Sequence, residues 1–429
     1  MEKTLSKLEK YSILEHPPIP DEQFLSQIGR LKDRNDEIDA SLLFAVAHDA
    51  VDFLITEDKG IHTKAGRLGL DERVLLVDQA AEIFTRLGQR RVPQHTLIEH
   101  LPVHNLQIND PFFNSLRKSY PTFDEWFVKI SREGRCGWVL RERGRILALC
   151  IYKEEPDRAD SDAIPLPSLK ICTLKVADEV SGRRIAELFL KLSFQYTIKN
   201  HLCSTYFTAH SDQESLIGLM TDFGFVEIGM KGEEHILMKH MTPPKVIDHS
   251  TDSLNYAIKY YPHFMTEGNV KKFIIPIQPE FHNRIFPDCP GTQPRLCDFT
   301  EISPEGNTIK KAYICNAKTM EIHAGDVLLF YRSHDQRAIT SIGIVERTIR
   351  TSNPSEIVRT VGNRTVYSFN EIRALASKHA LVIIFRHMEN LLKPVKHSVL
   401  SRSVGVKGPV QSIRRIDDDL FQRIMRLAR

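Results

Sequence analysis

The sequence predicts a chain of several domains that combine α/β and α+β architecture. Three observations point to this class. Residues 35–84 alternate helical and strand-like patterns, which is typical of a parallel sheet. Residues 169–190 pass from a β-rich run through a short polar turn into a helical run, and residues 308–427 consist mainly of short strands around a small helix, as in a small β-barrel. The predicted organisation is a domain at 1–100, a second at 101–242, a connecting segment at 243–300 and a third domain at 301–429.

Length and composition set the limits for any function. A chain of 429 residues with 41% hydrophobic and 26% charged residues can build more than one packed core. The net charge of +3 is small, so any affinity for nucleic acid has to come from local patches. The sequence has no run of eighteen apolar residues and no signal-peptide pattern, so we expect a cytoplasmic protein without a membrane partner. The seven cysteines are scattered without a CxxC pair, which predicts neither a disulfide framework nor a zinc site.

Carboxylates gather around the first predicted strands. Asp36 and Asp39 open an apolar helical run, and Asp58 follows the strand predicted at 51–56. Carboxylates that meet at the carboxyl ends of parallel strands can hold Mg²⁺ for phosphodiester hydrolysis. The same residues also suit helix N-termini, and their spacing alone favours this capping role.

This region resembles the C-terminal half of PIN-domain ribonucleases, in which an Asp precedes an apolar helix and a strand ends in Thr-x-Asp/Asn. Asp39 matches the first position, and Thr56 with Asp58 matches the second. The resemblance implies Mg²⁺ at Asp39 and Asp58 only if the PIN-like site is active. Residues 1–30 lack the family's first strand and its essential Asp, so we expect a truncated PIN-like domain kept for folding or for contact with RNA or a protein partner.

The central region contains a turn suited to an anion. A strand predicted at 169–176 leads through a turn into a helix predicted at 185–199. A helix N-terminus placed after a strand offers unpaired backbone N–H groups and the positive end of the helix dipole, which favour a pyrophosphate. Gly182 allows close approach, while Arg183 and Arg184 add positive charge. The alternative is an ordinary strand–turn–helix with solvated arginines.

The order of elements around this turn resembles the GNAT acyltransferases. A helix at 112–130 and a hairpin at 137–152 precede it, and a strand, a helix and two further strands follow between residues 204 and 239. The family's acetyl-CoA turn, Gln/Arg-x-x-Gly-x-Gly/Ala, corresponds to residues 179–184 with one glycine kept. The family's closing helix, Gly-Phe and strand correspond to residues 219–225 and beyond. The resemblance implies a mixed sheet that binds acetyl-CoA through Leu174, Lys175, Val176, Ser181, Gly182, Arg183 and Arg184.

The catalytic groups are less well defined. GNAT enzymes often protonate the leaving thiolate with a Tyr a few residues before the Gly-Phe, where this chain has Leu219 and Met220. The nearest substitutes are Tyr206 and His210, and Glu227 is a weaker candidate base. The alternative places Tyr206 in the core and His210 in a loop.

The C-terminal region carries a third resemblance. Residues 324–333, AGDVLLFYRS, and 341–346, SIGIVE, resemble the ASCH/PUA-like barrels, a superfamily whose members commonly bind RNA. Basic side chains in turns can contact phosphates, and a tyrosine can stack on a base. The candidate nucleic-acid-binding residues are Tyr331, Arg332, Arg337, Arg402 and Lys407. The alternative is a solvated basic rim.

These patterns lead to one main hypothesis and two alternatives. The main hypothesis is an acyl-CoA-dependent N-acetyltransferase that acts on an amine of an RNA-linked substrate, such as a tRNA, or of a protein. The flanking modules would serve recognition. The alternatives are a non-catalytic RNA-binding regulator with vestigial nuclease and transferase domains, and a Mg²⁺-dependent PIN-type ribonuclease.

Overall fold

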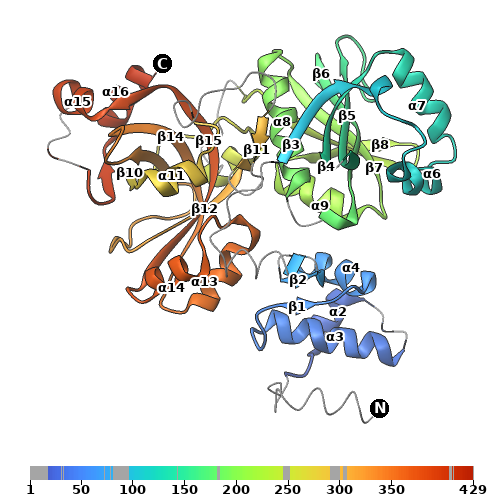
Figure 1. Ribbon diagram of the computed structural model, residues 1–429, viewed down its shortest axis with the longest axis horizontal. Coiled ribbons are helices and arrows are strands. Elements are labelled where there is room, and N and C mark those ends of the chain that lie inside the picture. The colour runs from blue at the N-terminus through green and yellow to red at the C-terminus, as the bar shows by residue number, and fades with distance from the viewer. Residues whose placement is uncertain are drawn as a thin grey trace. The chain divides into compact units, whose positions relative to one another are not determined.

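The chain folds as two compact units, Met1–Ala80 and Ala81–Arg429. The computed structural model describes residues 18–80, 96–180, 184–244, 252–289, 300–302 and 307–428, apart from positions 30, 32, 72, 78, 143, 405–407 and 409. Both units mix helices with strands (Figure 1). Across the described residues, no helix combines the length and apolar character needed to span a membrane.

The first unit is a small α/β body. Its two strands pair in parallel, with Leu54 opposite Val74, which confirms the predicted βα alternation, although each strand is only two residues long. Phe24, Leu43 and Ile61 join the three helices in one core. The elements are α2 (Glu22–Ile28), α3 (Arg34–Ala47), β1 (Leu54–Ile55), α4 (Lys59–Arg67) and β2 (Val74–Leu75).

The second unit contains a mixed sheet of eight strands in the order β11-β3-β4-β5-β6-β7-β9-β8. All neighbours are antiparallel except β6 and β7, which run parallel. The strands are β3 (Thr96–Pro102), β4 (Cys136–Glu142), β5 (Arg145–Glu155), β6 (Ser168–Val176), β7 (Ser204–His210), β8 (Val226–Lys231), β9 (Glu234–His240) and β11 (Thr300–Ile302).

Helices cover both faces of this sheet. Phe127 and Ile130 of α7 (Phe123–Arg132) pack on one face, next to α6 (Asn114–Ser119), whereas α8 (Ile185–Lys199) and α9 (Glu214–Asp222) pack on the other. Figure 1 shows α7 and α8 on opposite sides of the sheet. The helix expected at 112–130 is broken at Pro121, because proline lacks an N–H and restricts the residue before it.

The rest of the second unit is built on a six-stranded mixed sheet in the order β12-β15-β14-β13-β10-β16. The described strands form an open sheet with β12 and β16 at its edges, where we expected a small barrel. The strands are β10 (Lys272–Ile277), β12 (Lys310–Cys315), β13 (Val327–Arg332), β14 (Ala338–Thr351), β15 (Ala380–Lys396) and β16 (Arg414–Ile416). The helices are α10 (Ser253–Lys259), α11 (Pro279–Ile285), α13 (Pro354–Val361), α14 (Phe369–Ala376), α15 (His397–Val399) and α16 (Asp418–Ala428).

The expected connecting segment, residues 243–300, contributes directly to this sheet. Its strand β10 pairs in parallel with β13 and antiparallel with β16. Residues 320–322 are irregular, and residues 399–404 are helical.

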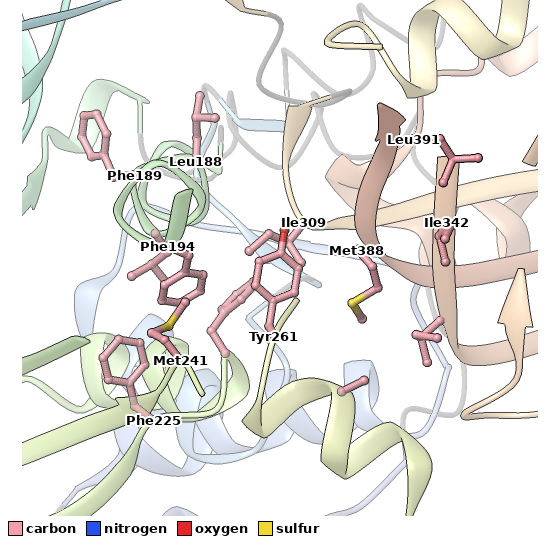
Figure 2. Close-up of a cluster of buried hydrophobic side chains, with 14 of the residues drawn as sticks. Leu188, Phe189, Phe194, Phe225, Met241, Tyr261, Ile309, Ile342, Met388 and Leu391 are labelled. Carbon is pink, nitrogen blue, oxygen red and sulfur yellow. The ribbon is translucent and has the colours of Figure 1, made fainter. Parts of the chain in front are cut away.

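One hydrophobic core joins the two sheets of the second unit. Figure 2 shows Phe194 of α8 and Phe225 on one side of Tyr261, with Met388 of β15 on the other. The Phe194 and Tyr261 ring centroids lie 5.8 Å apart. The two regions therefore fold against each other as one body.

Candidate functional site

The parallel strands β6 and β7 separate at their carboxyl ends. Their pairing begins at Ser168 and Ser204 and ends at Ile171 and Phe207, although both strands continue beyond those residues. We call the separated segments, residues 173–176 of β6 and 208–210 of β7, the splay. β6 keeps its β5 partner as far as Val176, whereas beyond Ile171 the described residues give it no strand partner on the other side. Ligands of α/β sheets bind at such carboxyl ends.

A β-bulge marks the point of separation. Ile151 of β5 lies opposite Thr173, whereas its neighbour Tyr152 lies opposite Ile171, so Cys172 is an extra residue in β6. A bulge bends its strand and increases the local twist, which turns β6 away from β7 at the start of the splay. The expected donor-binding residues Leu174, Lys175 and Val176 follow the bulge and are half-buried.

The side chain of Lys175 is engaged elsewhere. Its ammonium donates to the backbone oxygen of Phe112 and to the hydroxyl of Ser115. Burial lowers the pKa of Lys175. Lys175 therefore ties Phe112 and the first turn of α6 to the splay.

The N-terminus of α8 is held by charge pairs. Arg184 adopts a φ of 57°, in the left-handed region that favours glycine, at the position where the GNAT pattern has Gly or Ala. Its Nη1 lies 3.0 Å from Oε2 of Glu187, a buried carboxylate whose pKa is raised by burial. Arg184 thus neutralises Glu187 at the start of the helix. Ser181, Gly182 and Arg183 lie outside the described residues.

The three expected catalytic residues separate into different environments. Tyr206 is fully buried beside Ile236 and Met238, and its hydroxyl donates to Glu155. Burial and this hydrogen bond raise the pKa of Tyr206 far above its ordinary value. These are the contacts of a core residue, which agrees with the alternative we considered for it.

His210 ends β7 at the edge of the splay. Its Nε2 lies 3.7 Å from Oε1 of Glu234, the residue opposite it on β9. The ring of Tyr120 lies near, with its centroid 6.0 Å from that of His210. Burial is the main cause that raises the pKa of the Tyr120 hydroxyl, and the negative charge of Glu234 raises it further. We had not selected Tyr120 or Glu234 from the sequence, because the register that places Glu234 opposite His210 depends on the pairing of β7 with β9.

Glu227 belongs to a second group of side chains on the outer strand β8. Its Oε1 lies 2.9 Å from Nδ1 of His235. His210 and Glu227 therefore do not form one site, because each pairs with a different partner.

The carboxylates of the first unit bind a lysine. Lys64 Nζ lies 2.7 Å from Asp36 and 2.8 Å from Asp39. Asp58 accepts from the backbone N–H groups of Gly60 and Ile61, which confirms its capping role. Within the part of the chain that the structure describes, no group of three or more His, Cys, Asp or Glu side chains could hold a metal. The Mg²⁺ expected at Asp39 and Asp58 is thus without support, because an ammonium already neutralises the first carboxylate.

The candidate nucleic-acid-binding residues of the C-terminal region fall into a buried group and an exposed group. Tyr331 and Arg332 are buried, and Arg332 donates to Asp335 and Asn283 at 2.6 Å each. The Arg332 side chain joins β13 to α11 and to the following turn, and both side chains are too buried to contact a nucleic acid. Arg337 and Arg402 are exposed. Lys407 lies outside the described residues.

The fold and the splay define the class as a two-sheet α/β protein: a mixed sheet, in which one parallel pair separates before a strand–turn–helix, is joined to a second, six-stranded mixed sheet. Residues 306–410 match the family model described as a domain of unknown function, DUF365. No curated protein matches the chain.

Several solved structures are each similar to about a third of the chain. The ASCH protein of Zymomonas mobilis is 13% identical with a TM-score of 0.29, over 37% of this chain and 95% of that one. The ribosomal-protein-alanine N-acetyltransferase of Brucella melitensis is 15% identical with a TM-score of 0.27, over 34% of this chain and 99% of that one. The PaiA N-acetyltransferase of Thermoplasma acidophilum, in complex with coenzyme A, is 12% identical with a TM-score of 0.26, over 33% of this chain and 98% of that one.

Proposed function

We propose that the protein is an acyl-CoA-dependent N-acyltransferase whose donor, acetyl-CoA, lies in the splay. The observation that carries this proposal is the end of pairing between β6 and β7 after Ile171 and Phe207, at the Cys172 bulge. An extended pantetheine arm carries amide and carbonyl groups. It can therefore take the place of a strand beside residues 173–176, as peptides do at open sheet edges.

The chemistry follows from the groups around the splay. A backbone N–H of residues 173–176 polarises the thioester carbonyl, which the acceptor amine attacks. His210 takes the amine's proton, and the Glu234 carboxylate 3.7 Å away stabilises the imidazolium that forms. The C–S bond then breaks. Tyr120, whose pKa is raised by burial, keeps its proton at neutral pH and supplies it to the leaving thiolate.

The acceptor is an amine of an RNA-linked or protein substrate. The exposed Arg337 and Arg402, together with Lys407, are the residues proposed to contact nucleic acid. The pyrophosphate of the donor is assigned to the turn that carries Ser181, Gly182, Arg183 and Arg184.

Calorimetric titration with acetyl-CoA tests the proposal. The wild type is expected to bind one equivalent, and Thr173→Trp, which places a large ring at the start of the splay, is expected to weaken binding at least tenfold. Val226→Trp is the matched control, because Val226 is exposed on β8, two strands away from β7. The proposal fails if the wild type binds no acetyl-CoA or if both variants bind it equally well.

A further inference from the structure

Three side chains at the end of the central sheet form a continuous hydrogen-bonded chain. Ser211 Oγ lies 2.9 Å from Nε2 of His235, and Nδ1 of His235 lies 2.9 Å from Oε1 of Glu227. Ser211 follows β7, His235 lies on β9 and Glu227 on β8. Three separate strands of one sheet thus bring the group together.

These two hydrogen bonds determine which atom is the donor and which is the acceptor at each contact. A carboxylate only accepts hydrogen bonds, so Nδ1 of His235 carries the proton that Glu227 accepts. In a neutral imidazole the other nitrogen, Nε2, is then an acceptor. The hydroxyl of Ser211 must therefore donate to Nε2. These are the roles of nucleophile, base and orienting acid in a serine hydrolase.

We propose that Ser211 is a nucleophile activated by His235 and Glu227, and that it hydrolyses an acyl thioester. This is a second activity, and its choice of thioester rests on the proposed acyl-CoA function. The substrate class is a thioester because the donor assigned to the splay ends beside this serine.

The position of the group agrees with such a substrate. Residues 208–210 form the β7 side of the splay, and Ser211 is the next residue. The turn that carries Ser211 leads into α9, which begins at Glu214. A serine between a strand and a helix N-terminus lies near backbone N–H groups and a positive dipole end, which suit a developing oxyanion.

The register of the strands places the two His–Glu pairs on opposite faces of the sheet. His210 lies opposite Glu234, and the next pair along, Ala209 and His235, points to the other face. Glu227 shares that other face, because it lies opposite Leu237, which packs in the core with α8. The amine-activating base and the proposed nucleophile are therefore separate groups that flank one splay.

The reaction proceeds in two balanced steps. Ser211 Oγ attacks the thioester carbonyl while its proton passes to Nε2 of His235. The C–S bond breaks, and the thiolate takes that proton, which leaves an ester on Ser211. Water then attacks the ester, with His235 accepting its proton and returning it to Oγ as the free carboxylic acid departs.

Fluorophosphonate labelling tests the nucleophile without any acyl donor. Ser211 is exposed, so the reagent can reach it. In the wild type, peptide mapping is expected to find the label on Ser211. Ser211→Ala loses this label, and His235→Ala slows it by about 10²–10⁴-fold. Glu227→Gln also slows it, because a carboxamide does not stabilise the imidazolium as a carboxylate does.

The chain offers a matched control. Ser352 Oγ lies 3.1 Å from Nδ1 of His379, and both residues are exposed. No carboxylate among the described residues lies within ion-pair distance of His379. Ser352→Ala should therefore leave the labelling of Ser211 unchanged. Labelling of Ser211 no faster than that of Ser352 would overturn the proposal.

Incubation with acetyl-CoA in the absence of an amine tests the second activity. The expected result is release of free CoA thiol and one acetyl group on the peptide that contains Ser211, both lost in Ser211→Ala. A protein that binds acetyl-CoA but is not labelled at Ser211 overturns this inference alone. Labelling at Ser211 in a protein that binds no acetyl-CoA overturns the proposed acyltransferase instead.

Discussion

His210 and Glu234 face each other across β7 and β9, with the imidazole Nε2 3.7 Å from the carboxylate. We expect His210→Ala to lower kcat for amine acylation by about 10²–10⁴-fold, because the amine then loses its proton to water alone. The KM for acetyl-CoA should change little, since the proposed donor site is the backbone of β6 and does not include the His210 side chain. Steady-state release of CoA with a panel of amines measures both constants.

Two variants complete this test. Glu234→Gln should lower kcat by a smaller factor, because His210 stays in place without its charged partner. His201→Ala, which removes an exposed histidine just after α8, should leave kcat unchanged. Equal activity in His210→Ala and the wild type would exclude His210 as the base.

The buried Lys311 should make the stability of the protein depend on pH. Lys311 is 1% exposed, and its ammonium donates to the backbone oxygen of Ile285 at 2.7 Å. Burial, reinforced by the nearby Lys191, lowers the pKa of Lys311 from 10.5 to about 7. Between these two pH values the unfolded chain binds a proton that the folded chain does not. The free energy of unfolding should therefore rise with pH across this window, by about 1.4 kcal/mol per unit from this group.

Urea unfolding of the wild type and Lys311→Met at several values between pH 7 and 10 measures this effect. The methionine has no proton to lose, so its profile should be flatter over that range. Parallel profiles for the two proteins would contradict the assignment.

Local patterns in the sequence were sufficient for most of the central fold. The helix at Ile185–Lys199 has the predicted bounds, because its apolar residues repeat with helical spacing between clear turn signals. β10 was misplaced in a connecting segment, because its membership of a sheet depends on Lys272 pairing with Val327 far along the chain. Local spacing contains no information about such partners.

The site shows the same division. Local patterns led to the turn before α8 and to His210 as candidates, and their roles stay predictions. For Tyr206 they left a catalytic and a core position open, because its burial depends on Ile236 and Met238 of β9 packing against the same face of the sheet. The Ser211, His235 and Glu227 chain also depends on three strands meeting, and its residues form no recognisable motif in sequence.

Substitution of Glu187 should cause a large loss in the free energy of unfolding. Its carboxylate is buried, accepts from the backbone N–H of Lys310 at 2.8 Å and pairs with Arg184. Glu187→Ala leaves these donors without a carboxylate, and we expect a cost of about 3–5 kcal/mol in the free energy of unfolding. Because Lys310 begins β12 of the other sheet, the loss should affect both sheets together.

Denaturant unfolding followed by two probes, one for each sheet, measures this loss. Glu187→Gln should cost less, since the carboxamide oxygen can still accept from Lys310. Glu125→Ala, at an exposed position of α7, should change stability by less than about 0.5 kcal/mol. A cost for Glu187→Ala as small as that of the control would show that the buried contact contributes little.

Because Lys64 pairs with Asp36 and Asp39, we expect the first unit not to respond to Mg²⁺. Burial lowers the pKa of Lys64, but its hydrogen bonds to Asp36 and Asp39 outweigh this and raise the pKa above its ordinary value. The ammonium is therefore charged at neutral pH and pairs with both carboxylates. Mg²⁺ should leave hydrogen exchange in α3 and α4 of the wild type unchanged, compared with NaCl at equal ionic strength.

Removal of the ammonium makes the test sharper. In Lys64→Ala the two carboxylates repel each other, so exchange in α3 and α4 should be faster, by an amount equivalent to about 1–3 kcal/mol. Mg²⁺ should then slow exchange in this variant, because a cation can again lie between Asp36 and Asp39. Lys64→Arg, which keeps a positive charge, should behave like the wild type. Slower exchange in the wild type on adding Mg²⁺ would show that the lysine does not exclude the metal, and that a nuclease function for this unit has to be considered again.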